Sequence, residues 1–420
     1  MPSLFSLSPR VTHYHRRRFG GIPILALCLF LLLSLSLPLS ASESAFTFAA
    51  EYDRTVTVAG SAERPVSLPS VYAKGAILMN GKTGEVYFER NADARLPMAS
   101  TTKIMTALVA VEALPLDTVI TVDRAAVGVE GSSVYLYAGE TLTLEALLYA
   151  LLLQSANDAA VAIAYGVAGG IPEFAEMMNN KARSLGLTNT NFENPHGLDS
   201  EEHYTTARDL ARIASAALSS DVLRTIVSTY KKTIPQQNTD GIRLLVNHNR
   251  LLRSYDGCIG VKTGYTRRSG RCLVSAADRG GLLLVAVTLS SSNDWKEHKE
   301  MLDYGYSMYE SVVLSESGEL SYTIPVFNGV ASSVTASYKT ENGDPLSVIL
   351  SKNHSEITCS VELPQFLWGS YKKGSVIGRV LFFCNEKIIC EVPLTLDLDV
   401  SEISYRLGLF DKIRNLFTKT

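Results

Sequence analysis

Ser100 and Lys103 are a pair of residues whose types and spacing could do chemistry. They stand at the two ends of Ser100-Thr101-Thr102-Lys103, where a helical pattern begins. Residues three apart share one face of a helix, so the hydroxyl and the amine can come within hydrogen-bond reach. A serine becomes a strong nucleophile when a base takes its proton, and lysine can be that base if burial lowers its pKa. The same residues also fit a plain helix start in which Ser100 is a cap.

Ser155-Ala156-Asn157 forms a polar break between two strongly apolar helical patterns. Buried polar groups need a partner, so this break either serves a site or caps the helix that follows. In a catalytic role, Ser155 relays protons between Lys103 and a leaving amine, while Asn157 holds a substrate amide. The spacing leaves both interpretations open.

Lys262-Thr263-Gly264 lies in a β-rich run. Gly264 leaves room for another backbone, and an extended peptide can add to a strand edge of this kind. Lys262 then supplies positive charge for a substrate carboxylate and Thr263 hydrogen-bonds to that carboxylate. An ordinary strand that ends in a bend is the alternative.

Together the three elements form a known ensemble, because Ser-x-x-Lys, a Ser-x-Asn type element and Lys-Thr-Gly are the signature of penicillin-binding proteins and class A β-lactamases. The chain resembles the low-molecular-weight penicillin-binding proteins that act as serine-type D-alanyl-D-alanine carboxypeptidases. Four stretches carry the resemblance: Leu96-Pro97-Met98-Ala99-Ser100-Thr101-Thr102-Lys103-Ile104-Met105-Thr106, Gln154-Ser155-Ala156-Asn157-Asp158-Ala159, Asn194-Pro195-His196-Gly197-Leu198 and Val261-Lys262-Thr263-Gly264-Tyr265-Thr266.

The resemblance implies acylation of Ser100, with Lys103 as general base and Ser155 as the relay. It also implies Asn157, Lys262, Thr263 and Gly264 as substrate-binding residues, peptidoglycan stem peptides ending in D-Ala-D-Ala as substrates, and β-lactams as covalent inhibitors. No metal or organic cofactor is implied. The oxyanion hole is expected at the backbone N–H of Ser100 and at a backbone N–H near Tyr265 or Thr266.

Some features depart from the wider family. Tyr265 follows the Lys-Thr-Gly element where some relatives have histidine, and the Ser-Ala-Asn form differs from the Ser-Asp-Asn of class A β-lactamases. A β-lactamase of the same fold and a non-catalytic penicillin-binding wall scaffold are the alternative functions. A Ser-His-Asp triad would leave both lysines unexplained, so we expect His196 to order a loop and His203, with Asp209, to brace the next helix.

Helical patterns fill the chain between the second and third β-rich runs. The predicted helices span 101–112, 143–154, 158–167, 172–185 and 206–218. Predicted strands span 72–80, 85–90, 258–266, 271–277 and 282–289. A closing helix over 294–309 is expected to pack on the sheet through Trp295, Met301, Leu302 and Met308.

We therefore predict an α/β (α+β) domain over residues 70–312, with a five-stranded antiparallel sheet and helices. The resemblance implies that it is transpeptidase/β-lactamase-like. Short alternating runs over 313–400 predict a small C-terminal all-β domain. Residues 401–420 form an amphipathic pattern, and this helix is expected either to dock on the β domain or to lie on a membrane surface.

The N-terminus has the pattern of an export signal. His15-Arg16-Arg17-Arg18 precedes an apolar run over 22–39 and then small residues. This order predicts a signal peptide over 1–45, with an uncleaved anchor as the alternative, and a linker over 46–69. Either form places the protein outside the cytoplasm, on the outer face of the cytoplasmic membrane.

Composition limits the range of partners. The chain has 420 residues, 19% charged, with a formal net charge of -3, which gives no basic excess to attract nucleic acid. An odd number of cysteines follows the signal, without spacing typical of a zinc site. We expect buried free thiols, although Cys384 and Cys390 flank a predicted hairpin and could bridge.

Overall fold

The computed structural model describes residues 49–56, 67–236, 241–340 and 343–403. The predicted signal over 1–45 and nearly all of the predicted helix over 401–420 lie outside these residues. Among the helices that the structure describes, none is both long enough and apolar enough to cross a lipid bilayer.

A five-stranded antiparallel sheet forms the frame of the domain that was predicted over residues 70–312. Its strands are β2 (Gly75–Asn80), β3 (Val86–Arg90), β8 (Cys258–Thr266), β9 (Gly270–Arg279) and β10 (Leu282–Ser291), in the order β3-β2-β10-β9-β8. This confirms the predicted sheet and places β8, which carries Lys262, at an edge. Residues that alternate along a strand face opposite sides, so both faces of the sheet can be covered.

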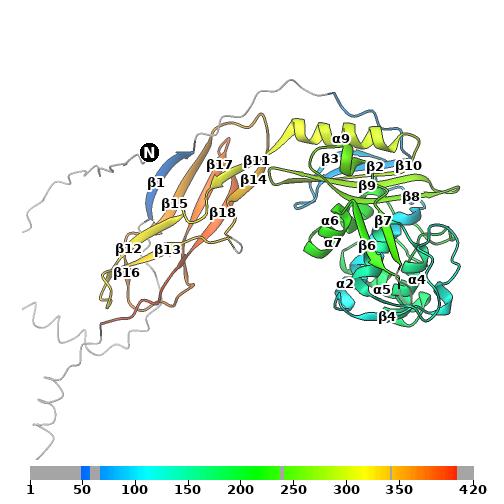
Figure 1. Ribbon diagram of the computed structural model, residues 1–420. Coiled ribbons are helices and arrows are strands. Elements are labelled where there is room, and N and C mark those ends of the chain that lie inside the picture. Colours follow the sequence, from blue (N-terminus) through cyan, green and yellow to red (C-terminus); the bar gives the residue numbers. More distant parts are fainter. Residues whose placement is uncertain (1–48, 57–66, 237–240, 341–342, 404–420) are drawn as a thin grey trace, which may run out of the picture. The chain divides into compact units, whose positions relative to one another are not determined.

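One face of the sheet packs on the closing helix α9 (Asp294–Met308), as Figure 1 shows. Leu78 and Leu284 on the sheet meet Met301 and Leu302 on the helix in one buried cluster. Trp295 was expected to pack there as well. That expectation is wrong, because Trp295 lies in the first turn of α9 and instead lines a cleft together with Ser100 and Thr263.

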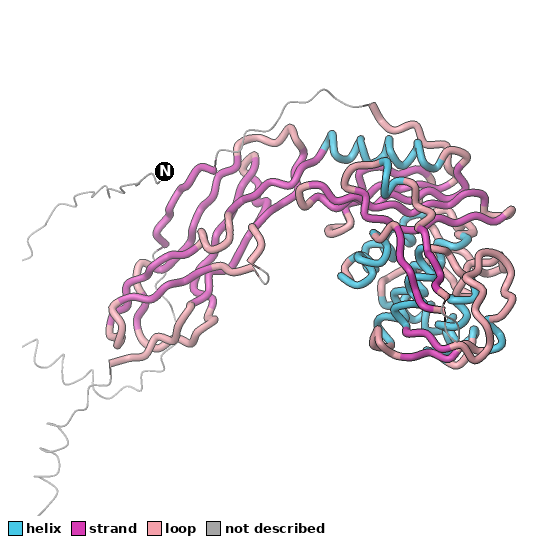
Figure 2. Tube along the Cα trace, in the orientation of Figure 1, coloured by secondary structure: helices cyan, strands magenta, loops and turns pink. Residues whose placement is uncertain are grey.

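The other face of the sheet is covered by the helices inserted between β3 and β8 (Figure 2). They are η1 (Ala99–Thr102), α2 (Lys103–Ala113), η2 (Arg124–Ala126), α3 (Leu144–Leu153), α4 (Asn157–Ala168), α5 (Ile171–Ser184), α6 (Ala207–Leu218), α7 (Asp221–Ser228) and α8 (Leu251–Ser254). Two small hairpins accompany them, β4 (Val119–Thr121) with β5 (Thr141–Thr143) and β6 (Lys231–Pro235) with β7 (Ile242–Val246).

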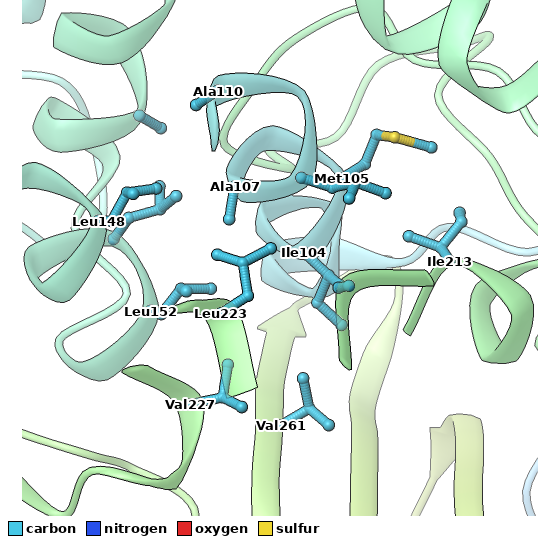
Figure 3. Close-up of a cluster of buried hydrophobic side chains, with 14 of the residues drawn as sticks. Ile104, Met105, Ala107, Ala110, Leu148, Leu152, Ile213, Leu223, Val227 and Val261 are labelled. Carbon is cyan, nitrogen blue, oxygen red and sulfur yellow. The ribbon is translucent and has the colours of Figure 1, made fainter. Parts of the chain in front are cut away.

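Helix α2 is central to this half of the domain. Figure 3 shows Ile104 and Met105 of α2 among side chains of α3, α6, α7 and β8, with Val261 of β8 close by. All but the last three of its residues are buried. Burying one such large side chain is worth about 1.5–3 kcal/mol, so the start of α2 is firmly held. Lys103 is the first residue of α2, and Ser100 lies in η1 directly before it.

The C-terminal domain is built from strands, as predicted. Its main sheet has the order β1-β15-β17-β18-β13-β12-β16, and β11 (Tyr309–Ser315) pairs with β14 (Leu346–Ser351). The other strands are β12 (Ser321–Phe327), β13 (Ser333–Ser337), β15 (Ile357–Pro364), β16 (Leu367–Trp368), β17 (Val376–Cys384) and β18 (Lys387–Leu396). Cys384 and Cys390 are free thiols, since Cys384 is opposite Lys387 in the β17–β18 pair.

The expected linker over 46–69 needs a correction. Residues Ala49–Val56 form strand β1, which pairs antiparallel with β15 over its full length. Edge strands leave unpaired backbone groups, so a segment of low apolar content can still add to a sheet through its main chain. Sequence patterning looks for apolar side chains and therefore missed this strand.

Candidate active site

Ser100 and Lys103 meet as their spacing predicts. Lys103 Nζ donates a hydrogen bond to Ser100 Oγ at 2.9 Å and another to the backbone oxygen of His196 at 2.6 Å. Ser100 lies in the tight turn of η1, where residues three apart stand one above the other. Neither η1 nor α2 has a side-chain cap, so Ser100 is not a helix cap.

Lys103 is fully buried, and its pKa lies well below the ordinary 10.5. Burial is the main cause, because it disfavours the charged amine, and the nearby charge of Lys262 adds to the effect. Asp158 acts in the opposite direction. An amine with a lowered pKa can be neutral near pH 7 and can then accept the proton of Ser100.

Ser155 lies in the short turn between α3 and α4. It is buried, and its φ of 61° is the left-handed conformation that side chains rarely adopt. The helix α4 that follows has Ala156 at its N-cap and no side-chain cap. The capping interpretation of Ser155 and Asn157 is therefore wrong, and the strained turn instead places Ser155 in the wall of the cleft.

Asn157 is held by the loop that precedes β5. Its backbone N–H donates to Ser132 O at 2.7 Å, and its side-chain Nδ2 donates to Glu130 O at 2.5 Å. Gly131 lies between these two acceptors, and a side chain there would meet Asn157 Nδ2 at 2.7 Å. The remaining atom, Oδ1, is buried without a hydrogen-bond partner. A substrate N–H is the kind of donor that this oxygen lacks.

Lys262 is the second buried amine of the site. Burial lowers its pKa to about 7, and its Nζ donates to the backbone oxygen of Thr263 at 2.9 Å. Thr263 and Gly264 line the cleft. A Cβ on Gly264 would stand 3.0 Å from Ser100 N and 3.1 Å from Met98 O, so the glycine lets β8 lie directly against the turn that contains Ser100.

One cleft of about 630 Å³ brings Ser100, Ser155, Thr263 and Gly264 together. It is lined as well by Ser132, His248, Arg250, Tyr265, Arg271, Asp294 and Trp295. Lys103 reaches the cleft through its hydrogen bond to Ser100. Three separate stretches of chain thus converge on one hollow beside the edge strand β8, as the motif pattern predicts.

The structure distinguishes between the two backbone N–H groups that were expected as the second oxyanion donor, those of Tyr265 and Thr266. The N–H of Thr266 already donates to Ser269 Oγ at 3.0 Å. Because a donor that is already used is a poor oxyanion ligand, Tyr265 is the better of the two expected donors on β8. Ser100 N–H lies close to Gly264 of the same strand.

His196 and His203, the two histidines considered in the sequence analysis, are buried and support the surrounding loops. Burial lowers the pKa of His196 to about 3 and that of His203 to about 4. His196 orders its loop by accepting from Leu198 N at 3.2 Å, as expected. The expected partnership of His203 with Asp209 is wrong. His203 contacts Thr102 Oγ1 at 2.8 Å, and so it supports η1, the turn that contains Ser100.

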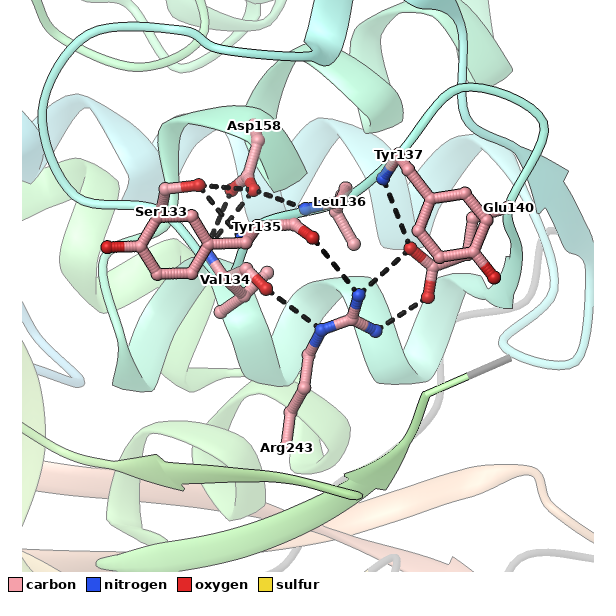
Figure 4. Close-up of polar contacts among 8 residues, drawn as sticks. All are labelled: Ser133, Val134, Tyr135, Leu136, Tyr137, Glu140, Asp158 and Arg243. Atoms are coloured by element: carbon pink, nitrogen blue, oxygen red, sulfur yellow. Dashed lines mark hydrogen bonds and ion pairs between the residues drawn. The ribbon is translucent and has the colours of Figure 1, made fainter. Parts of the chain in front are cut away.

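A polar network behind the cleft was missed by sequence reasoning (Figure 4). The Asp158 carboxylate accepts from Ser133 Oγ at 2.6 Å and from Leu136 N at 3.0 Å. On the other side of the same loop, Arg243 donates to Glu140 at 2.6 and 3.0 Å and to Val134 O at 2.8 Å. This network fixes the loop whose carbonyls hold Asn157. In the sequence, the only indication of this network was that a second polar residue, Asp158, directly follows Asn157.

Among the described residues, no group of three or more His, Cys, Asp or Glu side chains is arranged to hold a metal ion. The chemistry that the cleft offers is that of a hydroxyl, two amines with lowered pKa values and an amide oxygen.

Comparison with known proteins agrees with this geometry. Residues 62–293 match the family model described as D-alanyl-D-alanine carboxypeptidase, and residues 309–402 match that of the penicillin-binding protein 5 C-terminal domain. D-alanyl-D-alanine carboxypeptidase DacF of Bacillus subtilis is 32% identical over 79% of this chain and 87% of its own. DacC of Escherichia coli is 34% identical over 81% of this chain and 88% of its own. The structure of penicillin binding protein 5 from Haemophilus influenzae is 28% identical, with a TM-score of 0.62 over 80% of this chain and 100% of that one.

Proposed function

The chain belongs to the D-alanyl-D-alanine carboxypeptidase family of serine peptidases, and we propose that Ser100 of this protein cleaves the terminal D-alanine from peptidoglycan stem peptides. The observation that carries the proposal is the contact between the buried Lys103 amine and the Ser100 hydroxyl in a cleft that also holds Ser155 and Thr263.

Acylation begins when Lys103 Nζ takes the proton of Ser100 and Ser100 Oγ attacks the carbonyl carbon of the penultimate D-alanine. The oxyanion is held by the backbone N–H groups of Ser100 and Tyr265. Ser155 passes the proton from Lys103 to the leaving amine, the C–N bond breaks, and free D-alanine departs. An ester on Ser100 is left behind.

Deacylation reverses the proton path. A water molecule gives its proton to the neutral amine of Lys103 and attacks the ester carbonyl, and the proton then returns to Ser100 Oγ. Lys262 and Thr263 hold the terminal carboxylate of the substrate, and Asn157 Oδ1 accepts from a peptide N–H. A β-lactam acylates Ser100 by the same attack, since its ring amide takes the place of the scissile bond.

The decisive experiment follows covalent labelling and product release together. We expect labelled penicillin to attach to Ser100, and Ser100→Ala to lose both labelling and D-alanine release from a D-alanyl-D-alanine peptide. Lys103→Ala should bind the peptide but acylate at least 100-fold more slowly, about the low end of what a general base contributes. Lys232→Ala, which changes the same residue type outside the cleft, is the control.

The same assay separates the alternatives. Fast hydrolysis of a chromogenic cephalosporin without D-alanine release would show a β-lactamase. Binding of wall peptides without any D-alanine release would show a non-catalytic wall scaffold.

We further propose that the protein works outside the cytoplasm, on the outer face of the membrane. The basic, apolar and small segments of residues 1–45 support export, and the amphipathic pattern of residues 401–420 supports a peripheral contact with the membrane surface. Cell fractionation tests this: the full chain should sediment with membranes, and a chain ending at residue 400 should be released.

A further inference from the structure

A second hollow adjoins the catalytic cleft. It has a volume of about 320 Å³ and is lined by Tyr230, Asn247, Asn249, Arg250 and Arg253. Arg250 also lines the catalytic cleft, so the two hollows share a wall. The lining of the smaller one contains two guanidinium groups and no carboxylate. We call it the arginine pocket.

The loop that carries Arg250 is built by two buried asparagines. Asn247 Nδ2 donates to Val227 O at 3.0 Å, and Asn247 Oδ1 accepts from Asn249 N at 2.9 Å. Asn249 Oδ1 in turn accepts from Leu251 N at 3.0 Å. These side-chain hydrogen bonds hold the loop backbone on both sides of Arg250. The backbone at Arg250 is therefore fixed, although its side chain is exposed.

The cations of the arginine pocket rest on aromatic rings. The guanidinium carbon of Arg253 lies 5.1 Å from the ring centre of Tyr230, and one of its nitrogens donates to the Tyr230 hydroxyl at 3.2 Å. The guanidinium carbon of Arg250 lies 5.9 Å from the ring centre of Trp295. Within the described part of the chain, no carboxylate lies at ion-pair distance from Arg250 or Arg253. Their charge is therefore available to a ligand.

The other arginine of the cleft is already neutralised. Arg271 pairs with Asp294 at 3.1 Å. In the proposed reaction the terminal carboxylate of the peptide is held by Lys262 and Thr263. The two guanidinium groups of the arginine pocket are thus left for a second negative group.

We propose that the arginine pocket binds a carboxylate that the wall peptide carries outside its D-alanyl-D-alanine terminus. A guanidinium offers paired donors that match the two oxygens of a carboxylate, so such a group fits this lining better than a neutral side chain. The inference rests on the proposed function for the identity of the peptide. It adds a specificity determinant upstream of the scissile bond.

Two peptides test the inference. Both end in D-alanyl-D-alanine, and they differ at one internal residue, which has a free carboxylate in the first and the corresponding amide in the second. For the natural chain we expect kcat/KM for D-alanine release to be about 3- to 10-fold higher with the acid, since exposed charge pairs contribute modestly. The double variant Arg250→Ala, Arg253→Ala should bring this ratio close to 1, because the rate with the acid should fall further than the rate with the amide.

A matched control removes one positive charge elsewhere. Arg124 is exposed and lines neither hollow, so Arg124→Ala should keep the ratio of the natural chain. An unchanged ratio in the double variant would overturn the inference. An equal loss with both peptides would also overturn it, because the arginines would then serve the terminal carboxylate that both peptides share.

A binding measurement separates this inference from the proposed function. The two peptides are titrated against Ser100→Ala, with and without the two arginine substitutions, and binding is followed by fluorescence anisotropy. If the natural chain releases no D-alanine, the proposed function fails, yet a tighter Kd for the acid that disappears with the arginines still supports the pocket. Equal Kd values for both peptides with the arginines present would refute it.

Discussion

The cleft contains two buried lysines, Lys103 and Lys262, whose pKa values are lowered by different surroundings. Lys103 touches the nucleophile, and its pKa is lowered both by burial and by the charge of Lys262. The pKa of Lys262 is lowered by burial alone, to about 7. In the proposed mechanism the neutral form of Lys103 is needed as a base, whereas the charged form of Lys262 is needed to hold a carboxylate.

This division predicts a bell-shaped pH dependence. As the pH rises through the lowered pKa of Lys103, its amine loses a proton and kcat/KM should increase. Above a pH of about 7, Lys262 loses its charge and kcat/KM should fall. A bound carboxylate stabilises the charged amine, so the alkaline limb of kcat should lie at higher pH than that of kcat/KM. Initial rates from pH 5 to 10 measure both curves, and coincident limbs would contradict the role given to Lys262.

Gly264 provides a second prediction at the level of single residues. In Gly264→Ala the new Cβ would meet Ser100 N and Met98 O, and backbone atoms of this kind cannot easily move away. We expect slower acylation by penicillin, with a loss of stability of about 1–3 kcal/mol. Stopped-flow acylation and urea unfolding measure the two effects. Acylation at the natural rate would show that the close approach of β8 to Ser100 is not required.

At the level of elements, the loop over residues 130–140 positions Asn157 of the Ser155-Ala156-Asn157 motif. Asp158 holds this loop on one side and the Arg243–Glu140 ion pair holds it on the other. Glu140 is completely buried and Arg243 nearly so, which makes their ion pair sensitive to the loss of one partner. Arg243→Ala should lower the free energy of unfolding by about 3–5 kcal/mol, because it leaves the Glu140 charge buried alone. The combined variant Arg243→Met, Glu140→Leu should lose much less.

The variant Arg243→Met, Glu140→Leu also allows effects on stability to be distinguished from effects on acylation. If the loop places Asn157 and Ser155, the combined variant should fold and yet acylate with penicillin more slowly than the natural chain. Thermal unfolding and labelling rates are the two measurements. A stable variant that labels at the natural rate would limit the Arg243–Glu140 pair to a role in folding.

These elements also show how far sequence reasoning reached. The strands of the five-stranded sheet and six helices of the same domain were predicted within a few residues, since their apolar runs are long and helices such as α3 and α6 begin at a threonine cap. Helix α7 and the β6–β7 hairpin were missed, because their short patterns resemble loops. The Ser100–Lys103 contact follows from spacing, but the Arg243–Glu140 pair joins residues 103 positions apart. Only the fold brings such a pair together.

At the level of the whole molecule, the fully buried hydrophobic residues of the two folded parts form separate clusters. Every buried member of the two catalytic clusters precedes residue 303, whereas those of the β domain begin at Val312. A chain that ends at Met308 should therefore still fold and label with penicillin at the natural rate. Loss of labelling in a folded truncated chain, judged by circular dichroism, would show that the β domain supports the site.

Three buried histidines make the stability of the molecule depend on pH. The pKa is about 3 for His196, about 4 for His203 and about 3 for His298, all below the ordinary 6.5. Between these values and 6.5 the unfolded chain binds protons that the folded chain does not. The free energy of unfolding should therefore decrease as the pH falls from about 6.5 towards 4, by up to about 1.4 kcal/mol per pH unit for each histidine.

His298 allows this linkage to be tested in isolation. It contacts Ser275 Oγ at 2.5 Å and Thr288 Oγ1 at 2.9 Å, on strands β9 and β10, and it is completely buried away from the cleft. His298→Gln keeps a polar side chain but has no proton to bind. Because glutamine cannot repeat both ring-nitrogen contacts, the variant should be less stable than the natural chain at pH 7. Between pH 6.5 and 4.5 it should then lose about 2–3 kcal/mol less than the natural chain does. Urea unfolding at several pH values gives both slopes. Parallel slopes would mean that His298 takes up its proton at the same pH in the folded protein as in the unfolded chain, so that burial does not lower its pKa.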